Sequence, residues 1–273
     1  MKEKLRVLDL FSGIGGFSLG LDNARTPCGQ VGFETAAFCE IEDYPRRVLK
    51  KNWPEVPCYN DVTKLTADIL EQDGISVDVI TGGFPCQDIS VAGKQAGIGD
   101  GTRSGLWSEI VRLIGELRPS YVIVENVAAL LSGPSEQRGG WFGRILGDLA
   151  ECGYDAEWEN IPASAMGAPH RRERVWIVAY PNKDGRTQSI LSKVYGEKGA
   201  WGNQKIWGCN WEFPKMGPKV YPICNGRLDS SKPYRVDDGF PDWPQRLAAH
   251  GNAVIPQIPE LIGRAILDVE NET

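Results

Sequence analysis

Apolar runs alternate with amphipathic segments along residues 1–180. The apolar runs at 5–11, 33–42, 77–85, 121–127 and 173–180 read as strands. The segments at 15–24, 44–53, 104–117 and 141–154 read as helices; in 104–117 apolar residues recur at intervals of three and four. Near-continuous apolar strands that alternate with helices indicate a mostly parallel sheet covered on both faces. The pattern therefore predicts an α/β fold, with a doubly wound domain over residues 1–180.

The pattern changes at Pro181. Residues 181–245 hold no long periodic segment, are dominated by Gly, Pro, Asn, Lys and Trp, and contain four of the nine tryptophans. They predict a second, smaller domain of short strands and turns. Helical periodicity returns in VIPQIPELIGRAILDVE, with Pro259 near the helix start. We therefore expect residues 246–273 to return to the first domain.

Composition is typical of a globular protein, with 41% hydrophobic and 24% charged residues. No run approaches the roughly 18 apolar residues that a membrane span needs, and the N-terminal MKEKLRVLDLF offers no cleavable signal peptide. Seven cysteines without paired spacing favour a reducing interior over a disulfide scaffold. The predicted localisation is the cytoplasm.

The formal net charge of −6 argues against a polyanionic partner only if charge is spread evenly. Residues 181–250 carry 11 Lys/Arg and 7 Asp/Glu, a balance of +4, which leaves −10 for the remainder. A basic segment on an acidic body permits contact with nucleic acid through one face.

Glycines follow the first expected strand in DLFSGIGGFSLGL. Gly13, Gly15 and Gly16 allow a sharp turn and a close approach to a ligand at the start of a helix. A dinucleotide-binding fingerprint would have a glycine where this chain has Ser18.

Two acidic residues extend this pattern. Glu40, at the end of the second strand, is placed to accept both ribose hydroxyls of an adenosine. Asp61, after the third strand region, is placed to take an adenine amino group. A glycine turn with a ribose acid, but without a full pyrophosphate cradle, suits an adenosine ligand that lacks phosphates, such as S-adenosylmethionine.

Cys86 lies in GGFPCQDIS, a turn that follows an apolar strand. A thiolate at a strand end is a candidate nucleophile if its surroundings activate it. Neither His170 nor His250 lies in a pattern that is typical of the catalytic base of a Cys/His hydrolase. The spacing of Cys209 and Cys224 does not predict a zinc site, so we expect no metal.

Glu125 ends the strand VIVENV one strand–helix–strand unit beyond Cys86, so the two side chains are expected to converge. A carboxyl beside an apolar strand has a raised pKa and can donate a proton. In HRRERV the period of two places Arg172 and Arg174 on one face and Arg171 on the other. Two guanidinium groups on one face require an anion, and Arg174 is placed to orient Glu125 or to contact a base carbonyl.

The motifs DLFSGIGG, GGFPCQDIS, VENV, HRRERV and GNAVIP occur in this order. In order and spacing they closely resemble those of the DNA cytosine-5 methyltransferases, in particular the short bacterial and phage-type members. The resemblance covers residues 5 to about 180 and about 235 to 267. It implies an S-adenosylmethionine-dependent enzyme with a small target-recognition domain at 181–245, and S-adenosylhomocysteine as product.

The resemblance also implies the chemistry. Attack of the Cys86 thiolate on cytosine C6 makes C5 nucleophilic toward the methyl group. Glu125 holds N3 and the exocyclic amine, and Arg174, with Arg172 behind it, fixes the base carbonyl and the loop. Because C6 is unreachable inside a duplex, the cytosine must flip out.

By the same resemblance, further residues hold the cofactor and the DNA. Ile41 packs on the adenine, and Ser90 touches a phosphate. The implied cofactor-binding residues are Phe11, Gly13, Gly15, Gly16, Glu40, Ile41, Asp61, Pro85, Leu106, Asn252 and Val254. The implied DNA contacts are Ser90 and Arg235, with phosphate contacts from Lys183, Arg186, Lys193, Lys198 and Lys205.

Two motifs depart from the family pattern. His170 stands where the family usually has glutamine, and this difference affects a loop contact and not the chemistry. The family's arginine-leucine motif is abbreviated to YRVDDGFPDWPQRL, in which Arg235 is the best match for the motif's arginine. The expected partner is double-stranded DNA, with no membrane. We expect a monomer, and a cognate restriction endonuclease on a separate chain is possible.

Three other functions compete with this one. A related branch of the fold methylates a cytosine in transfer RNA with the same cysteine chemistry. A regulatory relative that binds DNA without catalysis would keep the fold, although such proteins usually lose the cysteine, the acid or the glycines. A nicotinamide-dependent dehydrogenase explains only the glycine turn.

Overall fold

The computed structural model describes residues 3–85, 106–132, 140–168, 172–182, 189–195, 245, 249 and 251–272. Its strands are β1 Leu5–Leu10, β2 Phe33–Cys39, β3 Cys58–Tyr59, β4 Val79–Gly82, β5 Tyr121–Val127, β6 Tyr154–Pro162 and β7 Glu173–Pro181. Its helices are α1 Gly16–Asn23, α2 Asp43–Asn52, α3 Ala67–Gln72, α4 Trp107–Leu117, α5 Gly140–Glu151, α6 Ile190–Tyr195 and α8 Gln257–Glu272. Two 3-10 turns, η2 Ala128–Leu131 and η3 Ala163–Met166, follow β5 and β6.

The strands form one seven-stranded sheet in the order β3-β2-β1-β4-β5-β7-β6. The first five strands in this order, β3, β2, β1, β4 and β5, run parallel to one another. β7 runs antiparallel to both β5 and β6. The predicted α/β fold with a mostly parallel sheet is therefore confirmed. Chain order reverses between β1 and β4, and the loops at such a switch point diverge to leave a crevice at the carboxyl ends of the strands.

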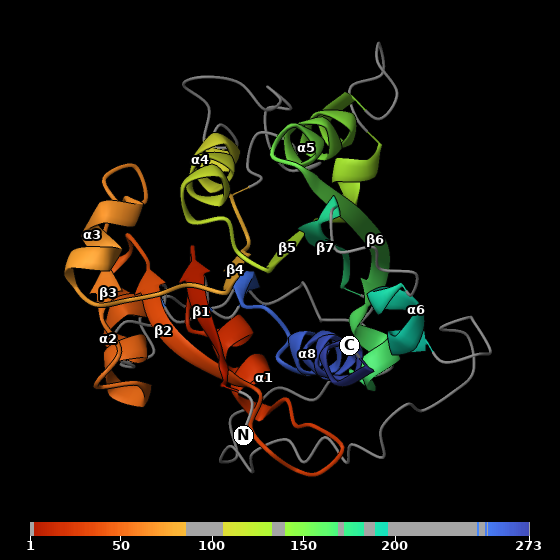
Figure 1. Cartoon of the computed structure of the whole chain (residues 1–273), viewed down its shortest axis with the longest axis horizontal. Coiled ribbons are helices and arrows are strands. Elements are labelled where there is room, and N and C mark those ends of the chain that lie inside the picture. The colour runs from red at the N-terminus through yellow and green to blue at the C-terminus, as the bar shows by residue number, and fades with distance from the viewer. Residues whose placement is uncertain are drawn as a thin grey trace, which may run out of the picture.

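Helices cover both faces of the sheet. Figure 1 shows α4 and α5 on one side, and α1, α6 and α8 on the other. Successive strand residues serve opposite faces, so Leu8 belongs to the core under α4 and α5, while Val7 belongs to the core under α1 and α8. This two-sided burial explains why the strands lack polar alternation.

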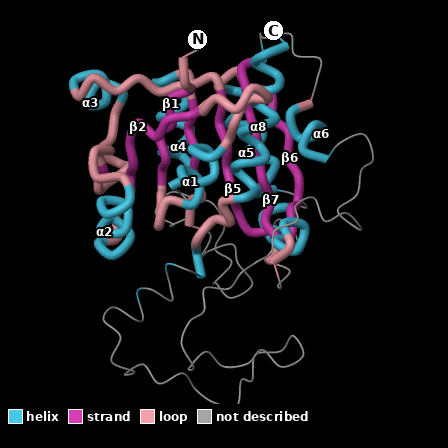
Figure 2. The backbone as a smooth tube through the Cα atoms, turned by 90° about the horizontal axis from the view of Figure 1, so that it is seen from below, coloured by secondary structure: helices cyan, strands magenta, loops and turns pink. Residues whose placement is uncertain are grey.

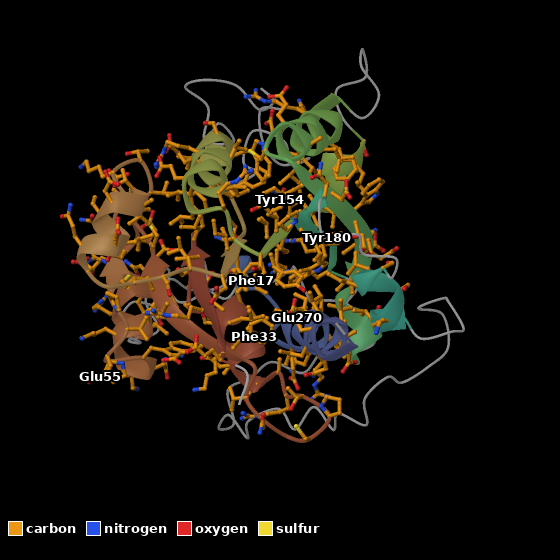
Figure 3. The ribbon with its side chains drawn as sticks, viewed as in Figure 1. Phe17, Phe33, Glu55, Tyr154, Tyr180 and Glu270 are labelled. Carbon is orange, nitrogen blue, oxygen red and sulfur yellow. The ribbon has the colours of Figure 1, made fainter. Side chains whose placement is uncertain are left out.

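Helix α8 packs directly on α1. A Cβ atom at Gly20 of α1 would lie 2.3 Å from the Pro256 carbonyl oxygen, and one at Gly263 of α8 would lie 2.9 Å from the Ala24 Cβ. Glycine is therefore required on both sides for the two segments to approach. Figure 3 shows Phe17 and Phe33 on this side of the sheet, where both belong to the core under α1 and α8.

The C-terminal end of α8 is hydrogen-bonded to the sheet. The Tyr121 hydroxyl at the start of β5 donates to Glu270 Oε1 at 2.7 Å. As a result β1 begins and α8 ends at the same edge of the sheet, opposite the carboxyl ends of the parallel strands (Figure 2).

Several elements were not predicted from the pattern. β6 is an edge strand whose sequence YDAEWENIP is largely polar, and α3 and α6 span only six residues each. α6 falls within 181–245, where short strands and turns were expected, and its Ile190 is buried in the core under α8. Apart from 181–182, 189–195 and 245, the expected target-recognition domain lies outside the described residues.

The close contact of α1 with the C-terminal segment predicts a stability effect. In Gly20→Ala the new methyl group meets backbone, so we expect the free energy of unfolding to fall by about 1–3 kcal/mol. Gly147→Ala on α5 is the matched control, because a Cβ there meets nothing within 4 Å. That variant should gain up to about 1 kcal/mol from helix propensity. Urea denaturation measures both, and equal effects would contradict this packing.

Candidate active site

The carboxyl ends of the central strands lie at one level of the sheet. Leu10 of β1 pairs with Cys39 of β2 and with Gly82 of β4, and Gly82 pairs in turn with Val124 of β5. The segments that follow these residues therefore leave the sheet side by side. They are the glycine turn, the Glu40 segment, the segment before Cys86 and the end of β5.

The glycine turn has an unusual backbone. Phe11, Gly13 and Gly15 have φ values of 52°, 54° and 87°. Phe11 pays a steric penalty of about 1 kcal/mol that glycine would avoid, which marks a turn held in a required shape. A Cβ at Gly15 would lie 2.7 Å from the Trp53 ring, and one at Gly16 would lie 2.7 Å from the Val254 carbonyl oxygen.

Glu40 is bonded to this turn. Its Oε2 accepts the Gly13 amide at 2.7 Å, and its Oε1 accepts the Glu42 amide at 2.8 Å. Burial raises the pKa of Glu40, and these amide bonds oppose the shift. Because each carboxylate oxygen can accept a second hydrogen bond, the group can still receive ribose hydroxyls. The next side chain, Ile41, is 72% exposed and offers an open apolar surface.

Asp61 follows β3 in a more exposed position. Its Oδ1 accepts the amide and the hydroxyl of Thr63 at 3.0 and 2.7 Å, and Oδ2 lies 3.3 Å from Lys64 Nζ. The Thr63 hydrogen bonds lower the pKa of Asp61. The carboxylate is therefore ionised and retains acceptor capacity for an amino group.

The remaining predicted cofactor residues border the same edge. Pro85 is half-buried after β4, and Leu106 packs against the core below α4. Asn252 is exposed, whereas Val254 packs against the core under α8 and reaches the glycine turn. The turn, Glu40 and the exposed Ile41 together fit an adenosine ligand without phosphates.

Glu125 and Arg174 form an ion pair at the end of β5. Arg174 Nε lies 3.0 Å from Glu125 Oε1, and the two side chains are 25% and 11% exposed. Burial raises the pKa of Glu125, and the charges of Arg174 and Arg172 oppose that shift. Glu125 Oε2 has no hydrogen-bond partner among the residues that the structure describes, and it faces Gly83, where a Cβ would lie 3.3 Å away. Among the described residues, Arg174 therefore fixes one of the two carboxylate oxygens.

Arg172 points elsewhere. Its Nη1 donates a hydrogen bond to the Gly251 carbonyl oxygen, so it joins β7 to the C-terminal segment. Burial and the charge of Arg174 lower the pKa of the Arg172 guanidinium, whereas the nearby Glu125 raises it. Arg172 therefore contributes positive potential to the Glu125 site without bonding to that carboxylate in this structure.

Asn126, which directly follows Glu125 and was not among the predicted site residues, binds the segment before Cys86. Its Nδ2 donates to the Phe84 carbonyl oxygen at 3.4 Å, and its Oδ1 accepts the Val127 amide at 2.8 Å. The Phe84 ring packs on Trp107, with centroids 5.5 Å apart. Trp107 Nε1 in turn donates to Asp148 of α5 at 2.7 Å.

Sequence reasoning also missed Asp9. It is fully buried in β1, and it accepts hydrogen bonds from Ser18 at 2.9 Å and from Thr81 at 2.8 Å. Burial raises its pKa to about 7. The signal was a single acid inside the apolar run LRVLDL.

Eight of the site residues singled out from the sequence lie outside the described residues: Cys86, Ser90, His170, Lys183, Arg186, Lys198, Lys205 and Arg235. Within the described ranges no group of three or more His, Cys, Asp or Glu residues could hold a metal ion. None of the described helices is long and apolar enough to cross a membrane.

Fold and site together define an α/β protein with a glycine turn and the buried Glu40 after β1 and β2, and with a buried acid–arginine pair at the end of β5. The sequence profile described as C-5 cytosine-specific DNA methylase matches residues 5–204. The chain belongs to this family, which confirms the resemblance drawn from the motifs.

Curated relatives agree. Type II methyltransferase M2.BsuMI of Bacillus subtilis strain 168 is 36% identical over 197 residues, covering 71% of this chain and 46% of the relative. Type II methyltransferase M.CviJI of Paramecium bursaria Chlorella virus IL3A is 34% identical over 200 residues, with coverages of 73% and 49%. The chain thus spans about half the length of the curated relatives it matches.

Solved structures share the fold. A protein described as a DNA modification methyltransferase encoded within a prophage (E. coli) superposes with a TM-score of 0.57 at 28% identity, covering 71% of this chain and 51% of that one. A mutant of Spodoptera frugiperda DNMT2 gives a TM-score of 0.54 at 22% identity, with coverages of 68% and 53%. The second likeness supports the fold alone.

The Glu125–Arg174 pair predicts a pH-dependent stability effect. Arg174→Gln leaves a buried carboxylate without its bonded cation, so we expect a loss of about 3 kcal/mol near pH 8. The loss should shrink near pH 5, because Glu125, with its pKa raised further, then protonates. Denaturant unfolding at both pH values measures this. Arg144→Gln is the control, because that arginine is 42% exposed and lies 3.6 Å from Asp148; its effect should stay within about 0.5 kcal/mol. Equal losses at both pH values would contradict the assignment.

The buried Asp9 predicts a second pH effect. A carboxyl whose pKa is raised by folding takes up protons on folding, so its stabilising contribution is complete below about pH 4 and is lost as the pH rises through about 7. We expect the wild-type free energy of unfolding, relative to Asp9→Asn, to decline by up to about 4 kcal/mol across this window. Denaturation at several pH values measures the difference, and parallel profiles would show that Asp9 does not titrate there.

Proposed function

We propose that this chain is a DNA cytosine-5 methyltransferase, which transfers a methyl group from S-adenosylmethionine to C5 of cytosine in a specific duplex sequence. The observation that carries the proposal is the Glu125–Arg174 pair, 3.0 Å apart, at the same sheet edge as the glycine turn. Between them β4 leads directly toward Cys86. The segments that carry the proposed acid, the proposed nucleophile and the proposed cofactor residues thus follow neighbouring strands in the sheet.

The proposed cofactor-binding residues are supported by two contacts, that of Gly13 with Glu40 and that of Gly16 with Val254. Glu40 receives the ribose hydroxyls, Ile41 packs on the adenine, and Asp61 accepts its amino group. Phe11, Gly13 and the neighbouring glycines hold the methionine part, with Pro85, Leu106, Asn252 and Val254 around the pocket. When bound, S-adenosylmethionine supplies an electrophilic methyl group and leaves as S-adenosylhomocysteine.

Cytosine C5 is a poor nucleophile, and the role of Cys86 is to change that. Its thiolate forms a bond to C6, which makes C5 enamine-like and able to take the methyl group. Loss of the C5 proton to a base then allows β-elimination, which breaks the C6–S bond and restores the thiolate and the aromatic ring.

Glu125 is suited to assist this addition. Arg174 holds Oε1, and Oε2, which has no hydrogen-bond partner among the described residues, would bind N3 and the exocyclic amine. Gly83 faces this oxygen, and a Cβ there would lie 3.3 Å away. Burial raises the pKa of Glu125, which favours donation of a proton to N3 as negative charge develops there. Arg174, supported by the positive potential of Arg172, would also contact the base carbonyl.

The substrate and partners follow from this reaction. The target base must leave the stack for C6 to be reached, so binding includes base flipping. Ser90 and Arg235 are proposed DNA contacts, and residues 181–245 are proposed to select the target. We propose a cytoplasmic monomer with a DNA-modification role. Its setting is either a pair with a cognate restriction endonuclease on a separate chain, or a solitary or phage-protective role.

The proposal is tested by mapping methylcytosine with bisulfite sequencing in DNA from an expression host without cytosine methylation. We expect marks in one recurring sequence context. Cys86→Ala should abolish them, and Glu125→Gln should slow transfer by about a hundredfold or more, because it removes a general acid. An unmarked genome from folded protein would contradict the DNA reaction.

Two measurements separate the competing functions. S-adenosylhomocysteine should raise the melting temperature of the wild-type protein, whereas NAD should not, which distinguishes a methyltransferase from a dehydrogenase. Methyl transfer to duplex DNA, compared with transfer to bulk transfer RNA, identifies the substrate class. Cofactor binding without transfer to either would indicate a regulatory relative.

A further inference from the structure

Asp9 is a fully buried carboxyl group that the proposed reaction leaves unused. It lies in the middle of the sheet, paired with Phe38 of β2 on one side and Thr81 of β4 on the other. Strand alternation places it with Val7 on the face that α1 and α8 cover. An apolar side chain would pack at this position without the desolvation cost of a carboxyl group.

Both carboxyl oxygens are hydrogen-bonded. Thr81 Oγ1 donates to Oδ1 at 2.8 Å, and Ser18 Oγ donates to Oδ2 at 2.9 Å. The Asp9 backbone carbonyl accepts the Ser12 hydroxyl at 2.5 Å. Ser18 is itself fully buried, as is Thr81. The three side chains therefore form a closed polar network inside an apolar core.

The network joins the two segments whose relative position matters for methyl transfer. Asp9 stands two residues before Phe11, where the cofactor turn begins, and Ser18 lies in the helix that follows the turn. Thr81 is the penultimate residue of β4, five residues before Cys86. One carboxyl group thus bonds to the frame of the methyl-donor site and to the strand that leads to the nucleophile.

Ser18 supports this interpretation. It occupies the position where the dinucleotide-binding fingerprint has glycine, which would offer no side chain to bond. Here the hydroxyl converts a helix–strand packing contact into a directed hydrogen bond to Asp9.

We propose that Asp9 is a positioning residue that, through Ser18 and Thr81, fixes the cofactor turn relative to the strand that presents Cys86. The proposal rests on the proposed methyl transfer for its consequence, but the coupling of the two segments can be tested without activity. Bonds of 2.8 and 2.9 Å to one rigid carboxyl group leave α1 and β4 little freedom to slide past each other.

The functional test is a double-mutant cycle of Ser18→Ala and Thr81→Val, with single-turnover methyl transfer measured at saturating DNA and cofactor. Each substitution should slow the step about tenfold, because small displacements of reacting groups are costly. The affinity for S-adenosylhomocysteine should change less than about threefold, since neither side chain is a cofactor contact. The double variant should be no slower than the worse single variant, because either change breaks the link.

Thr35→Val is the matched control. It removes a comparable hydrogen bond, from the largely buried Thr35 of β2 to Asp22 of α1 at 3.1 Å, without involving β4. We expect its single-turnover rate to equal that of the wild type. If Thr35→Val slowed methyl transfer as much as Thr81→Val does, the hydrogen bonds of Asp9 would only stabilise the core, and the positioning role would be wrong.

The structural test uses hydrogen–deuterium exchange of the protein without DNA or cofactor. Ser18→Ala should speed exchange of the amides at 82–84, and Thr81→Val should speed exchange at 13–16, whereas Thr35→Val should do neither. Changes confined to the substituted element would overturn the coupling, whatever the activity. Cross-element changes with unaltered transfer rates would overturn the role in positioning. A wild-type protein without transfer activity would instead refute the proposed function.

Discussion

Parallel neighbouring strands cannot be joined by a hairpin, and most of this molecule follows from that constraint. Each return to the starting edge requires a crossover, usually through a helix, so both faces of the sheet become covered and the strands become apolar on both sides. Where the order turns from β1 to β4, successive crossovers lie on opposite faces. At the carboxyl ends of these strands the chain places its glycine turn, Glu40 and Glu125.

Three buried carboxyl groups lie near this edge, and the partners of each determine what it can do. Glu40 is held by two backbone amides, which leave room for ligand hydroxyls. Glu125 is held at one oxygen by a guanidinium group, and its other oxygen has no hydrogen-bond partner among the residues that the structure describes. Asp9 is bonded at both oxygens by hydroxyls within the core. Similar burial is therefore compatible with the three different roles proposed for these groups: ligand binding, proton donation and internal connection.

The parts that could be predicted from the sequence are those where one physical rule dominates. The apolar runs located β1 and β5, because these strands are buried on both faces, and helical periodicity located α1 and α8, because each buries one side against the sheet. The period of two placed Arg174 toward Glu125, and the structure shows the ion pair. β6 was missed because an edge strand tolerates polar residues, and α6 because six residues give no period. Asp9 was missed because a lone acid in a strand reveals its partners only in three dimensions. The choice of DNA target depends in the same way on the geometry of loops, which no sequence pattern encodes.

The contact between the glycine turn and the C-terminal segment also constrains the order of events during synthesis. Gly16 and Gly20 are synthesised long before Val254 and Pro256, against which they pack. Until α8 has been synthesised, nothing from that helix covers the apolar side of α1, which includes Phe17. The nascent chain must therefore keep this apolar surface from aggregating in the meantime. The glycine turn gains its contact with the C-terminal segment only after translation has passed residue 256.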